Sequence, residues 1–353
     1  MKRKSNLLIT GAGGWFGNSL IKTLINSDFL ENFSSILISS IKTSDIKYLK
    51  ELKNICTKKD IELNVLHGYI NSNFFIQGLK KYIYNKNNIQ VIYAASVIHA
   101  NSKSKFWEIN YTSLKKFINC LNSNEIDKFV YISSNSPFGF SNLGEKFNEN
   151  SNYSPIGNYG ITKMAAEILL KNNFKKDTIR IIRPPWFHGN NMPERQKLFY
   201  KKVINRKFPL ILPGNNKRSI INTADLSKAT LNILCLPTKF MTYCVCEPES
   251  ISMIEFIRII QETYSESLKD GKEKYLKKKF RAIYLPPFTS SICLILDRLI
   301  QSMGFYSTII HVVSELGMNI EMSSKRYRKE FPNHKFSTIN ISIYEELKEA
   351  LQR

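Results

Sequence analysis

The glycine-rich stretch near the N-terminus constrains the fold of this chain more than any other feature. The apolar run 7–10 leads directly into Gly11-Ala12-Gly13-Gly14-Trp15-Phe16-Gly17, and apolar residues then recur at helical spacing up to Ile25. A strand, a tight glycine turn and a helix N-terminus direct backbone N–H groups and the helix dipole at one anion, and the missing side chains allow close approach. A plain glycine-rich turn is the alternative. Because the stretch opens a strand-helix-strand pattern, we predict that it holds the pyrophosphate of a dinucleotide.

Short apolar runs alternate with helical stretches over the first half of the chain. After 7–10, the predicted strands cover residues 35–40, 61–66, 90–95, 128–133 and 178–183. This alternation predicts an α/β fold with a Rossmann-type, doubly wound parallel sheet covered by helices on both faces.

Beyond Arg183 the predicted strands become sparse. We therefore expect a dinucleotide-binding domain over residues 1–183 and a smaller, mostly helical substrate-binding part over 184–353. Segments at about 219–246 are expected to return to the first domain.

The end of the second predicted strand bears on the choice of cofactor. An acidic residue normally accepts hydrogen bonds from the adenosine ribose at this point, but here the strand ends in Ser39-Ser40-Ile41-Lys42. Without a carboxylate there is no repulsion against a 2′-phosphate, and Lys42 offers that phosphate a partner. The pattern favours NADP over NAD. Lys42 also suits a solvated loop, and Asp45 lies close by, so NAD stays open.

A tyrosine, a lysine and a serine form the candidate reactive group. Tyr159 and Lys163 are four residues apart, so on a helix they share one face and the ammonium lies about one turn from the phenol. A fixed positive charge is one of the few means of lowering the pKa of a tyrosine from about 10. Ser134 ends the predicted strand before them, and a helix is predicted over 162–172. An ordinary amphipathic helix start is the alternative for this spacing.

Charge and cysteine content narrow the classes of partner. The formal net charge of +22 comes from basic residues spread along all 353 positions, without a nucleic-acid-binding module or an aromatic-interleaved basic run. We predict no nucleic-acid partner, and the charge suits an anionic small-molecule substrate. The six cysteines lack paired metal-ligand spacing. This pattern predicts no metal site, no disulfide framework and a reducing, cytoplasmic location.

The most apolar part of the second half covers residues 290–313. Asp297 and Arg298 interrupt it well before the ~20 residues that a membrane span requires. We predict no integral membrane span and leave peripheral membrane contact open. Association as a homodimer is also left open.

The order of these motifs resembles the extended short-chain dehydrogenase/reductase family, of the NAD-dependent epimerase/dehydratase type. The resemblance rests on the glycine turn, on Ala94-Ala95, on Asn110, on the segment 131–139 and on Tyr159-Gly160-Ile161-Thr162-Lys163. It implies an enzyme with a Rossmann fold that transfers hydride between NAD(P) and a carbinol or carbonyl carbon.

The resemblance also implies a role for each matching residue. Ser134 would hydrogen-bond the reacting oxygen, Tyr159 would exchange its proton, and Lys163 would hold the nicotinamide ribose. Asn110 would support the site. The implied cofactor contacts are Gly11, Gly14, Trp15, Phe16, Gly17, Lys42, Ala94, Ala95, Tyr159 and Lys163.

Two further positions bear on the substrate. Arg218 stands seven residues before Asp225, as does an arginine that binds the substrate diphosphate in the family's nucleotide-sugar enzymes. Trp186 stands where nucleotide-sugar epimerases usually have an asparagine, which indicates a more apolar or aromatic pocket. We expect a nucleotide-activated sugar as substrate, bound by Ser134, Trp186 and Arg218. A 3β-hydroxysteroid-dehydrogenase-like reductase of a hydrophobic alcohol or ketone is the alternative, and a dinucleotide-binding protein without turnover is a third hypothesis.

A departure from the family pattern disfavours one reaction. Dehydratases of this family commonly place an Asp-Glu pair directly after the active-site serine or threonine. Here these positions are Asn135 and Ser136, which cannot supply the acid and base for eliminating water.

Overall fold

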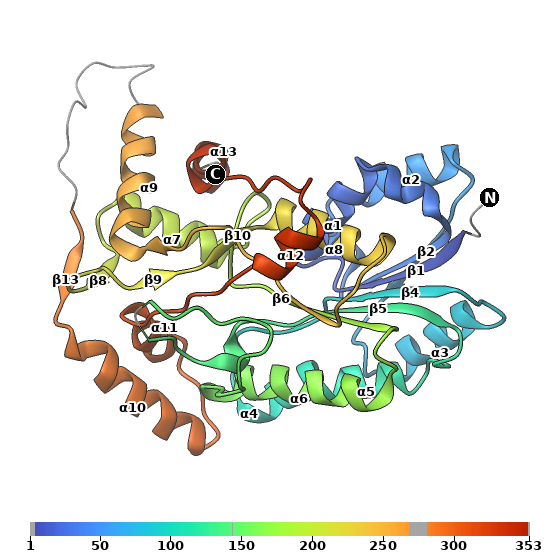
Figure 1. The fold of residues 1–353 in the computed structure, drawn as a ribbon, viewed down its shortest axis with the longest axis horizontal. Helices are drawn as coiled ribbons and strands as arrows, with labels where there is room; N and C mark the ends of the chain where they lie inside the picture. Colours follow the sequence, from blue (N-terminus) through green and yellow to red (C-terminus); the bar gives the residue numbers. More distant parts are fainter. Residues whose placement is uncertain (1–3, 143, 268–280, 352–353) are drawn as a thin grey trace.

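The computed structural model describes residues 4–142, 144–267 and 281–351. Its centre is a seven-stranded parallel sheet with the strand order β11-β6-β5-β4-β1-β2-β3 (Figure 1). The strands are β1 (Ser5–Thr10), β2 (Phe33–Ser40), β3 (Glu62–His67), β4 (Ile89–Tyr93), β5 (Ile126–Ile132), β6 (Ile179–Arg183) and β11 (Thr242–Cys244). The chain thus returns to the sheet with β11, far beyond β6 in sequence.

Both faces of this sheet are buried because its strands are apolar at nearly every position. In β1, Leu7 and Ile9 belong to the core on one face, and Leu8 belongs to the core on the other. Successive side chains of a strand point to opposite faces, so continuous apolar runs require a cover on each side.

Helices supply that cover, as Figure 1 shows. The first face carries α1 (Trp15–Ile25), α2 (Leu49–Lys58), α8 (Thr223–Cys235) and α12 (Lys325–Glu330). The second face carries α3 (Asn73–Ile83), α4 (Lys103–Trp107), α5 (Ser113–Ile118) and α6 (Gly157–Asn173). The connecting segments contain the short helical turns η1 (Asp28–Asn32), η2 (Thr43–Asp45), η3 (Glu108–Thr112) and η4 (Ser136–Phe138). The predicted Rossmann-type fold is confirmed.

Helix α6 differs from the expectation at its start. It begins at Gly157 rather than near 162, so Tyr159 lies in its first turn. Gly157 has φ of +77°, which glycine tolerates, and the N–H of Asn158 is bound by the side chain of Gln301 at 2.7 Å. Gly160 allows the turn to approach Ser136, because a Cβ there would lie 2.5 Å from the Ser136 carbonyl oxygen. These long-range contacts leave no local signal for the start of the helix.

The C-terminal part has its own core, formed around three helices and short strand pairs. The helices are α7 (Glu194–Ile204), α9 (Met253–Ser267) and α13 (Ile339–Leu351). The strand pairs are β7 (Trp186–His188) with β10 (Ile220–Asn222), β8 (Pro209–Ile211) with β13 (Ile283–Leu285), and β9 (Lys217–Arg218) with β12 (Ile251–Ser252). Helices α10 (Phe288–Ser302) and α11 (Thr308–Leu316) form a hairpin beside α6. The prediction of a mostly helical second part is confirmed.

A buried ionic cluster joins β7, α7 and α13. His188 donates from Nε2 to Glu247 at 2.5 Å and from Nδ1 to Glu346 at 2.9 Å, and the Tyr200 hydroxyl donates to Glu346 at 2.5 Å. All four side chains are buried. Burial alone would lower the pKa of His188, but the two carboxylates outweigh it and raise the pKa to about 9. His188 is therefore a cation at neutral pH.

No described helix combines the length and apolar character that crossing a membrane requires. Within the described residues, no group of three or more His, Cys, Asp or Glu side chains is arranged to hold a metal ion.

Candidate active site

The glycine turn predicted from the sequence lies between the end of β1 and the start of α1. Gly11 has φ of +73°, and its carbonyl oxygen accepts from the N–H of Gly14 at 3.0 Å. A Cβ on Gly17 would lie 2.1 Å from the same oxygen, and a Cβ on Gly11 would lie 2.9 Å from the backbone nitrogen of Ala95. Any side chain at either position would distort the turn. The turn thus leaves the N-terminus of α1 accessible to an anion.

The residues around the turn tie it to the neighbouring strands and to the C-terminal part. The Thr10 hydroxyl accepts from the N–H groups of Ala94 and Ala95 at 3.1 and 3.3 Å, so the ends of β1 and β4 lie together. The Trp15 indole donates to the Asn190 carbonyl oxygen at 2.8 Å. Phe16 is buried in the core under the sheet. The side chains of Trp15 and Phe16 therefore position the turn, and their backbone N–H groups lie at the start of the helix.

Asp45, in the η2 turn that follows β2, lies beside the glycine turn, and the cofactor contact expected of Lys42 stays a prediction. A Cβ on Gly13 would lie 2.7 Å from the Cβ of Asp45, so this acidic residue packs directly against the glycine turn. Asp45 is exposed in the η2 turn, and Lys42 is an exposed residue before it. Asp45 is thus close to where the ribose of a bound dinucleotide adenosine would lie.

Ser134, Tyr159 and Lys163 come together at the ends of β5 and α6, and we call them the tyrosine cluster. Lys163 is buried, and its ammonium donates to the Ile132 carbonyl oxygen at 2.8 Å. The same ammonium lies 5.9 Å from the centre of the Tyr159 ring. The hydroxyls of Ser134 and Ser96 both hydrogen-bond the Tyr159 phenol. The three residues predicted from the sequence therefore meet at one place.

The pKa values in this cluster follow from burial. Burial raises the pKa of Tyr159 to about 12, while Ser134, Ser96 and the charge of Arg195 act in the opposite direction. Burial lowers the pKa of Lys163 to about 7, although the Glu167 carboxylate raises it. At neutral pH the phenol holds its proton and can donate it. The effect of Lys163 on the phenol stays a prediction.

A buried network supports the tyrosine cluster and was not predicted from the sequence. Glu167, on α6 one turn after Lys163, accepts from the Ser133 hydroxyl and from the Tyr153 hydroxyl, each at 2.6 Å. It also pairs with Arg183 at the end of β6, whose Nη2 lies 2.6 Å away. The Arg183 guanidinium also lies over the Phe138 ring, 4.5 Å from its centre. This network fixes the ends of β5 and β6 against α6.

Asn110 lies beside the first turns of α6, and its expected role in supporting the site stays a prediction. It is buried, and its side chain bonds both backbone groups of Val97, with the Val97 N–H 2.8 Å and the carbonyl oxygen 3.0 Å away. Its amide also donates to the Thr162 hydroxyl at 3.2 Å, and its carbonyl oxygen accepts from Ser96 at 3.1 Å. Asn110 therefore joins the chain after β4 to α6. It lies in η3, a π-helical turn of a kind that is frequent at functional sites.

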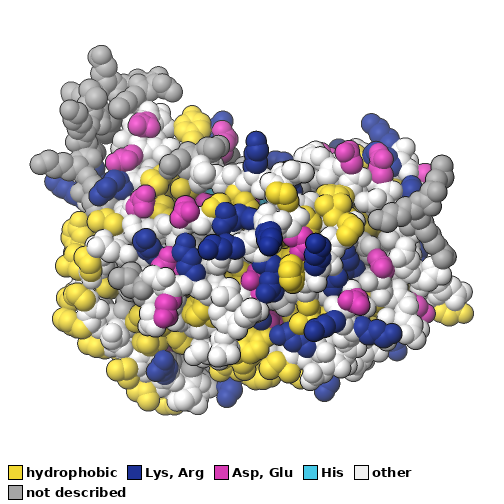
Figure 2. All heavy atoms as spheres, viewed as in Figure 1, with side chains coloured by type: hydrophobic (Ala, Val, Ile, Leu, Met, Phe, Trp, Pro, Cys, Tyr) yellow, Lys and Arg dark blue, Asp and Glu magenta, His cyan; other side chains and the backbone are white. Residues whose placement is uncertain are grey.

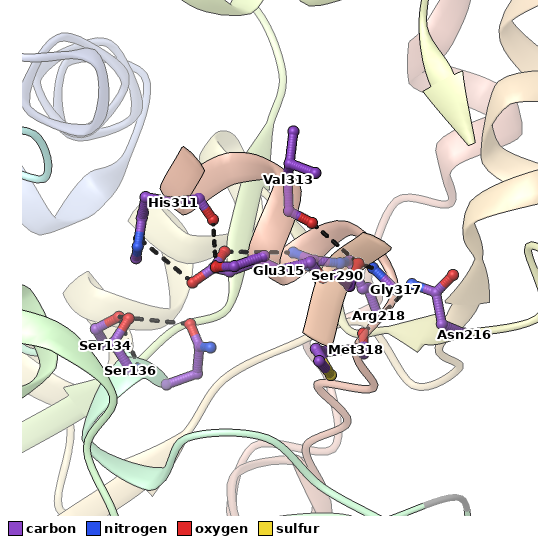
Figure 3. Close-up of polar contacts among 12 residues, drawn as sticks. Ser134, Ser136, Asn216, Arg218, Ser290, His311, Val313, Glu315, Gly317 and Met318 are labelled. Atoms are coloured by element: carbon purple, nitrogen blue, oxygen red, sulfur yellow. Dashed lines mark hydrogen bonds and ion pairs between the residues drawn. The ribbon is translucent and has the colours of Figure 1, made fainter. Parts of the chain in front are cut away.

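A second group of polar side chains lies across the site, and we call it the arginine cluster: Arg195, Arg218, Tyr306, His311 and Glu315. The Arg218 guanidinium donates to the Glu315 carbonyl oxygen at 2.5 Å, and His311 lies 3.5 Å from the Glu315 carboxylate. Figure 3 shows part of this cluster together with Ser134 and Ser136.

His99 links Arg195 and Tyr306 of the arginine cluster. It is hydrogen-bonded to Arg195 through Nε2, and its Nδ1 lies 2.8 Å from the Tyr306 hydroxyl. Burial alone would lower the pKa of His311, but Asp297 and Glu315 outweigh it and raise that pKa. Only Arg218 was predicted from the sequence. The other members come from segments far apart in the chain and match no local motif.

Trp186 lies in the C-terminal part, where its ring contacts other aromatic side chains. Its centre is 5.2 Å from that of Phe199 and 5.4 Å from that of Phe256. Both partners belong to the core of that part. The indole is half-buried and packs as an element of this core, and its expected substrate contact stays a prediction.

Comparison with known proteins identifies the family. A model of the NAD-dependent epimerase/dehydratase family matches residues 7–240, which is more than half of the chain. The chain belongs to this family. Its members are extended short-chain dehydrogenases/reductases, so the resemblance drawn from the motifs is confirmed.

Similar proteins cover most of the epimerase/dehydratase-family chain. Protein y4nL of Sinorhizobium fredii is 28% identical over 334 residues, 92% of this chain and 88% of that protein. The dTDP-D-glucose 4,6-dehydratase of Mus musculus is 24% identical over 286 residues, 77% of this chain and 78% of that one.

Solved structures show the same fold. DesIV of Streptomyces venezuelae, a dTDP-glucose 4,6-dehydratase with NAD and TYD bound, has a TM-score of 0.71 at 13% identity and covers 98% of this chain and 96% of its own. The UDP-glucuronic acid 4-epimerase of Bacillus cereus, in complex with NAD, has a TM-score of 0.69 at 14% identity and covers 98% of each chain.

The residues of this family member fit a nicotinamide dinucleotide. Gly11 and Gly17 stand where a Cβ would collide with the turn, and the turn leads into an 11-residue helix whose first N–H groups suit a pyrophosphate. The Lys163 ammonium uses one donor on the Ile132 carbonyl oxygen, and an ammonium carries two more that suit ribose hydroxyls.

Proposed function

We propose that this protein catalyses NAD-dependent hydride transfer at a carbinol carbon of a nucleotide-activated sugar, with epimerisation or net oxidation or reduction as the outcome. The observation that carries the proposal is the tyrosine cluster, in which the Tyr159 phenol meets the Ser134 hydroxyl beside the buried Lys163 ammonium. The cofactor supplies the hydride acceptor or donor.

The protein's own residues would move and hold the proton of the reacting oxygen. Tyr159, protonated at neutral pH, donates its proton to a carbonyl oxygen as that oxygen gains negative charge, and takes a proton back in the oxidative direction. The Ser134 hydroxyl hydrogen-bonds the same oxygen and fixes its position. Arg195 and Lys163 favour the anionic phenol in the oxidative direction because both can carry positive charge nearby.

The arginine cluster supports an anionic, phosphate-bearing substrate. Arg195 acts on Tyr159 electrostatically and also lies near Tyr306 and Glu315. Arg218 brings a further cationic group, and His311, whose pKa Asp297 and Glu315 raise, lies 3.5 Å from the same Glu315 carboxylate. Guanidinium groups suit diphosphate oxygens, and the dehydratases and epimerases among the similar proteins are named for dTDP- and UDP-sugars.

The residues after Ser134 support epimerisation or redox chemistry over the loss of water. The Ser136 hydroxyl lies 3.1 Å from that of Ser134, and the Asn135 side chain accepts from Ser134 at 3.4 Å. An amide and a hydroxyl here provide no carboxyl pair for elimination. The proposal therefore differs from the reaction named for the dTDP-glucose dehydratases among the relatives.

One experiment tests the reaction. The protein is incubated with NAD and a panel of UDP- and dTDP-sugars, and sugar products are identified by NMR and mass spectrometry. We expect an epimer or an oxidised sugar, and a rate about 10³-fold lower for Tyr159→Phe, because a positioned proton donor typically contributes 10²–10⁴-fold. Tyr69→Phe, at a 55%-exposed tyrosine, serves as the matched control. A product lacking one water would contradict the proposed chemistry.

We propose NAD rather than NADP because Asp45 packs against the glycine turn. A carboxylate there accepts from the ribose hydroxyls of NAD and repels a 2′-phosphate. Asp45→Ala should weaken NAD binding about tenfold, roughly the loss of one charge-assisted hydrogen bond, and strengthen NADP binding. Lys42→Ala should change neither. Fluorescence titration with NADH and NADPH measures both, and a loss of NADPH binding in Lys42→Ala would assign the phosphate to Lys42 instead.

A further inference from the structure

Helix α10 has its polar and apolar faces reversed relative to a normal surface helix. Its three buried side chains are polar, namely Ser290, Asp297 and Gln301. Six exposed apolar side chains, between 43% and 65% exposed, form a stripe at helical spacing along α10 and its C-cap: Phe288, Ile292, Ile295, Leu296, Leu299 and Met303. Water-facing helices normally carry the opposite pattern.

The contacts of the polar face fix this orientation. The Asp297 carboxylate accepts from Gln301 at 2.8 Å and from His311 at 2.9 Å. Gln301 in turn accepts from the Asn158 N–H at 2.7 Å, and Ser290 donates to the Val313 carbonyl oxygen at 3.0 Å. Turning the apolar stripe inward would break these hydrogen bonds and bury unpaired polar groups. The stripe is therefore held outward.

The apolar surface continues on both sides of α10. Ile283 and Tyr284 of β13 are about half exposed, and Phe305 and Ile309 after α10 are 65% and 78% exposed. In Figure 2 hydrophobic side chains gather on the lower left edge of the molecule, over the place of β13 and α10 in Figure 1. Large contiguous apolar patches on soluble domains mark interaction sites.

The charges around this apolar surface indicate which kind of partner it suits. Within residues 281–317 the acidic side chains are Asp297 and Glu315, and both are engaged on the inner side by His311 or Arg218. Exposed cations accompany the apolar face instead. Arg281 precedes the apolar face, and Arg298 lies at the edge of the stripe. Lys103 lies beside residue 305, because the Lys103 N–H donates to the Gly304 carbonyl oxygen at 3.3 Å.

A membrane surface with anionic lipids matches both properties. Apolar side chains enter the boundary of the acyl chains while arginine and lysine reach the phosphates. A second copy of the chain fits less well, since it would set the same cations against themselves in a protein of net charge +22. With 15 residues, α10 is about 22 Å long, too short for a ~30 Å hydrocarbon core. It would therefore lie in the plane of the interface.

We propose that the outer face of the α10–α11 hairpin binds the surface of membranes that contain anionic lipids. The inner face of the same hairpin carries His311 and Glu315 of the arginine cluster and contacts the first turn of α6 through Gln301. Membrane binding would thus bring the candidate active site next to the lipid surface. This inference does not depend on the proposed reaction.

Vesicle flotation tests the inference with the full-length protein. Vesicles of phosphatidylcholine with phosphatidylglycerol are compared with vesicles of phosphatidylcholine alone. We expect the protein to float with the anionic vesicles and only weakly with the neutral ones. Leu299→Asp should reduce the partition about tenfold or more, since burying one leucine contributes roughly that factor. Arg298→Glu should reduce binding to the anionic vesicles only.

Leu198→Asp is the matched control, because Leu198 is also a helical leucine and is 51% exposed compared with 55% for Leu299. It should float like the wild type, and all three variants should keep the wild-type melting temperature. The inference is overturned if the wild type floats with neither vesicle, or if Leu299→Asp floats as well as Leu198→Asp. A concentration-dependent dimer in sedimentation that Leu299→Asp dissociates, without vesicle binding, would assign the face to a second copy instead.

Discussion

The tyrosine cluster and the arginine cluster lie at one site but are held by different means. Ser134, Tyr159 and Lys163 come from 30 consecutive residues, at the end of a central strand and on one helix. The buried ion pair of Glu167 and Arg183 supports them by joining α6 to the end of β6. This cluster is therefore held by elements of the sheet domain itself, β5, β6 and α6.

The arginine cluster is assembled from separate elements. Arg195 comes from α7, Arg218 from β9, and His311 and Glu315 from α11. Its members are linked mainly to one another and to His99, on the loop after β4. The difference teaches that the groups proposed for proton transfer are held by the parallel sheet and its helices. The groups proposed to bind the substrate depend instead on how α7 and the α10–α11 hairpin dock. Variants of each support can test this division.

The largest expected effect is on the support of the tyrosine cluster. Glu167→Gln keeps the shape of the side chain but leaves the Arg183 guanidinium buried without its carboxylate. Breaking a buried ion pair on one side costs about 3–5 kcal/mol, so the free energy of unfolding should fall by that amount. The pKa of Lys163, which Glu167 raises, should fall further below about 7. Urea unfolding measures the first effect.

Glu108→Gln is the control for this variant, since Glu108 pairs with Lys105 at the surface. Its melting temperature should equal that of the wild type. If Glu167→Gln unfolded at the wild-type urea concentration, the tyrosine cluster would not depend on the buried pair, and the contrast between the two clusters would be wrong.

The second effect concerns the support of the C-terminal part, which carries Arg195 on α7. Glu346→Gln removes a carboxylate that holds His188 protonated and also accepts from Tyr200 of α7. The pKa of His188 is raised to about 9 in the folded protein against about 6.5 when unfolded, so its stabilising contribution is complete below about pH 6.5 and is lost as the pH rises through 9.

The destabilisation by Glu346→Gln should therefore be about 3 kcal/mol below pH 6.5 and shrink toward alkaline pH. Urea unfolding at several pH values, compared with Glu345→Gln at the exposed neighbouring position, measures this difference. A destabilisation that stayed constant from acid to alkaline pH would show that His188 is neutral in the folded protein.

The two clusters also differ in how far the sequence predicted them. The glycine turn and Ser134 follow the ends of strands, which a parallel sheet brings to one edge, and Tyr159 and Lys163 follow helical spacing. Asn110 was expected only from the resemblance to the family. The order of strands and helices was predictable for the same reason, because continuous apolar runs such as residues 7–9 require a cover on both faces.

The residues that the sequence did not predict depend on contacts between distant segments. Glu167 and Arg183 read as an ordinary helix glutamate and a strand-end arginine until the sheet brings them within 2.6 Å. Arg195, Tyr306 and His311 lie in segments without any motif, and Asp45 reaches the glycine turn only through the η2 turn. Local periodicity and spacing cannot predict such contacts, because each contact depends on how whole helices and strands pack together.

The smallest expected effect concerns the contact between α10 and α6, which connects the elements that carry the two clusters. Gln301 of α10 accepts from the Asn158 N–H at 2.7 Å, and its amide nitrogen lies where a Cβ on Gly157 would come within 2.9 Å. Gln301→Ala leaves that buried N–H unpaired and should cost about 1–2 kcal/mol of stability. Because the tyrosine cluster keeps its own support, kcat should change little. KM should rise, since the hairpin that carries His311 and Glu315 loses a contact with α6.

Ser302→Ala, at the exposed neighbouring residue, should change neither constant. A fall in kcat at unchanged KM would mean that the hairpin positions Tyr159 itself, and the two clusters would then act as one unit.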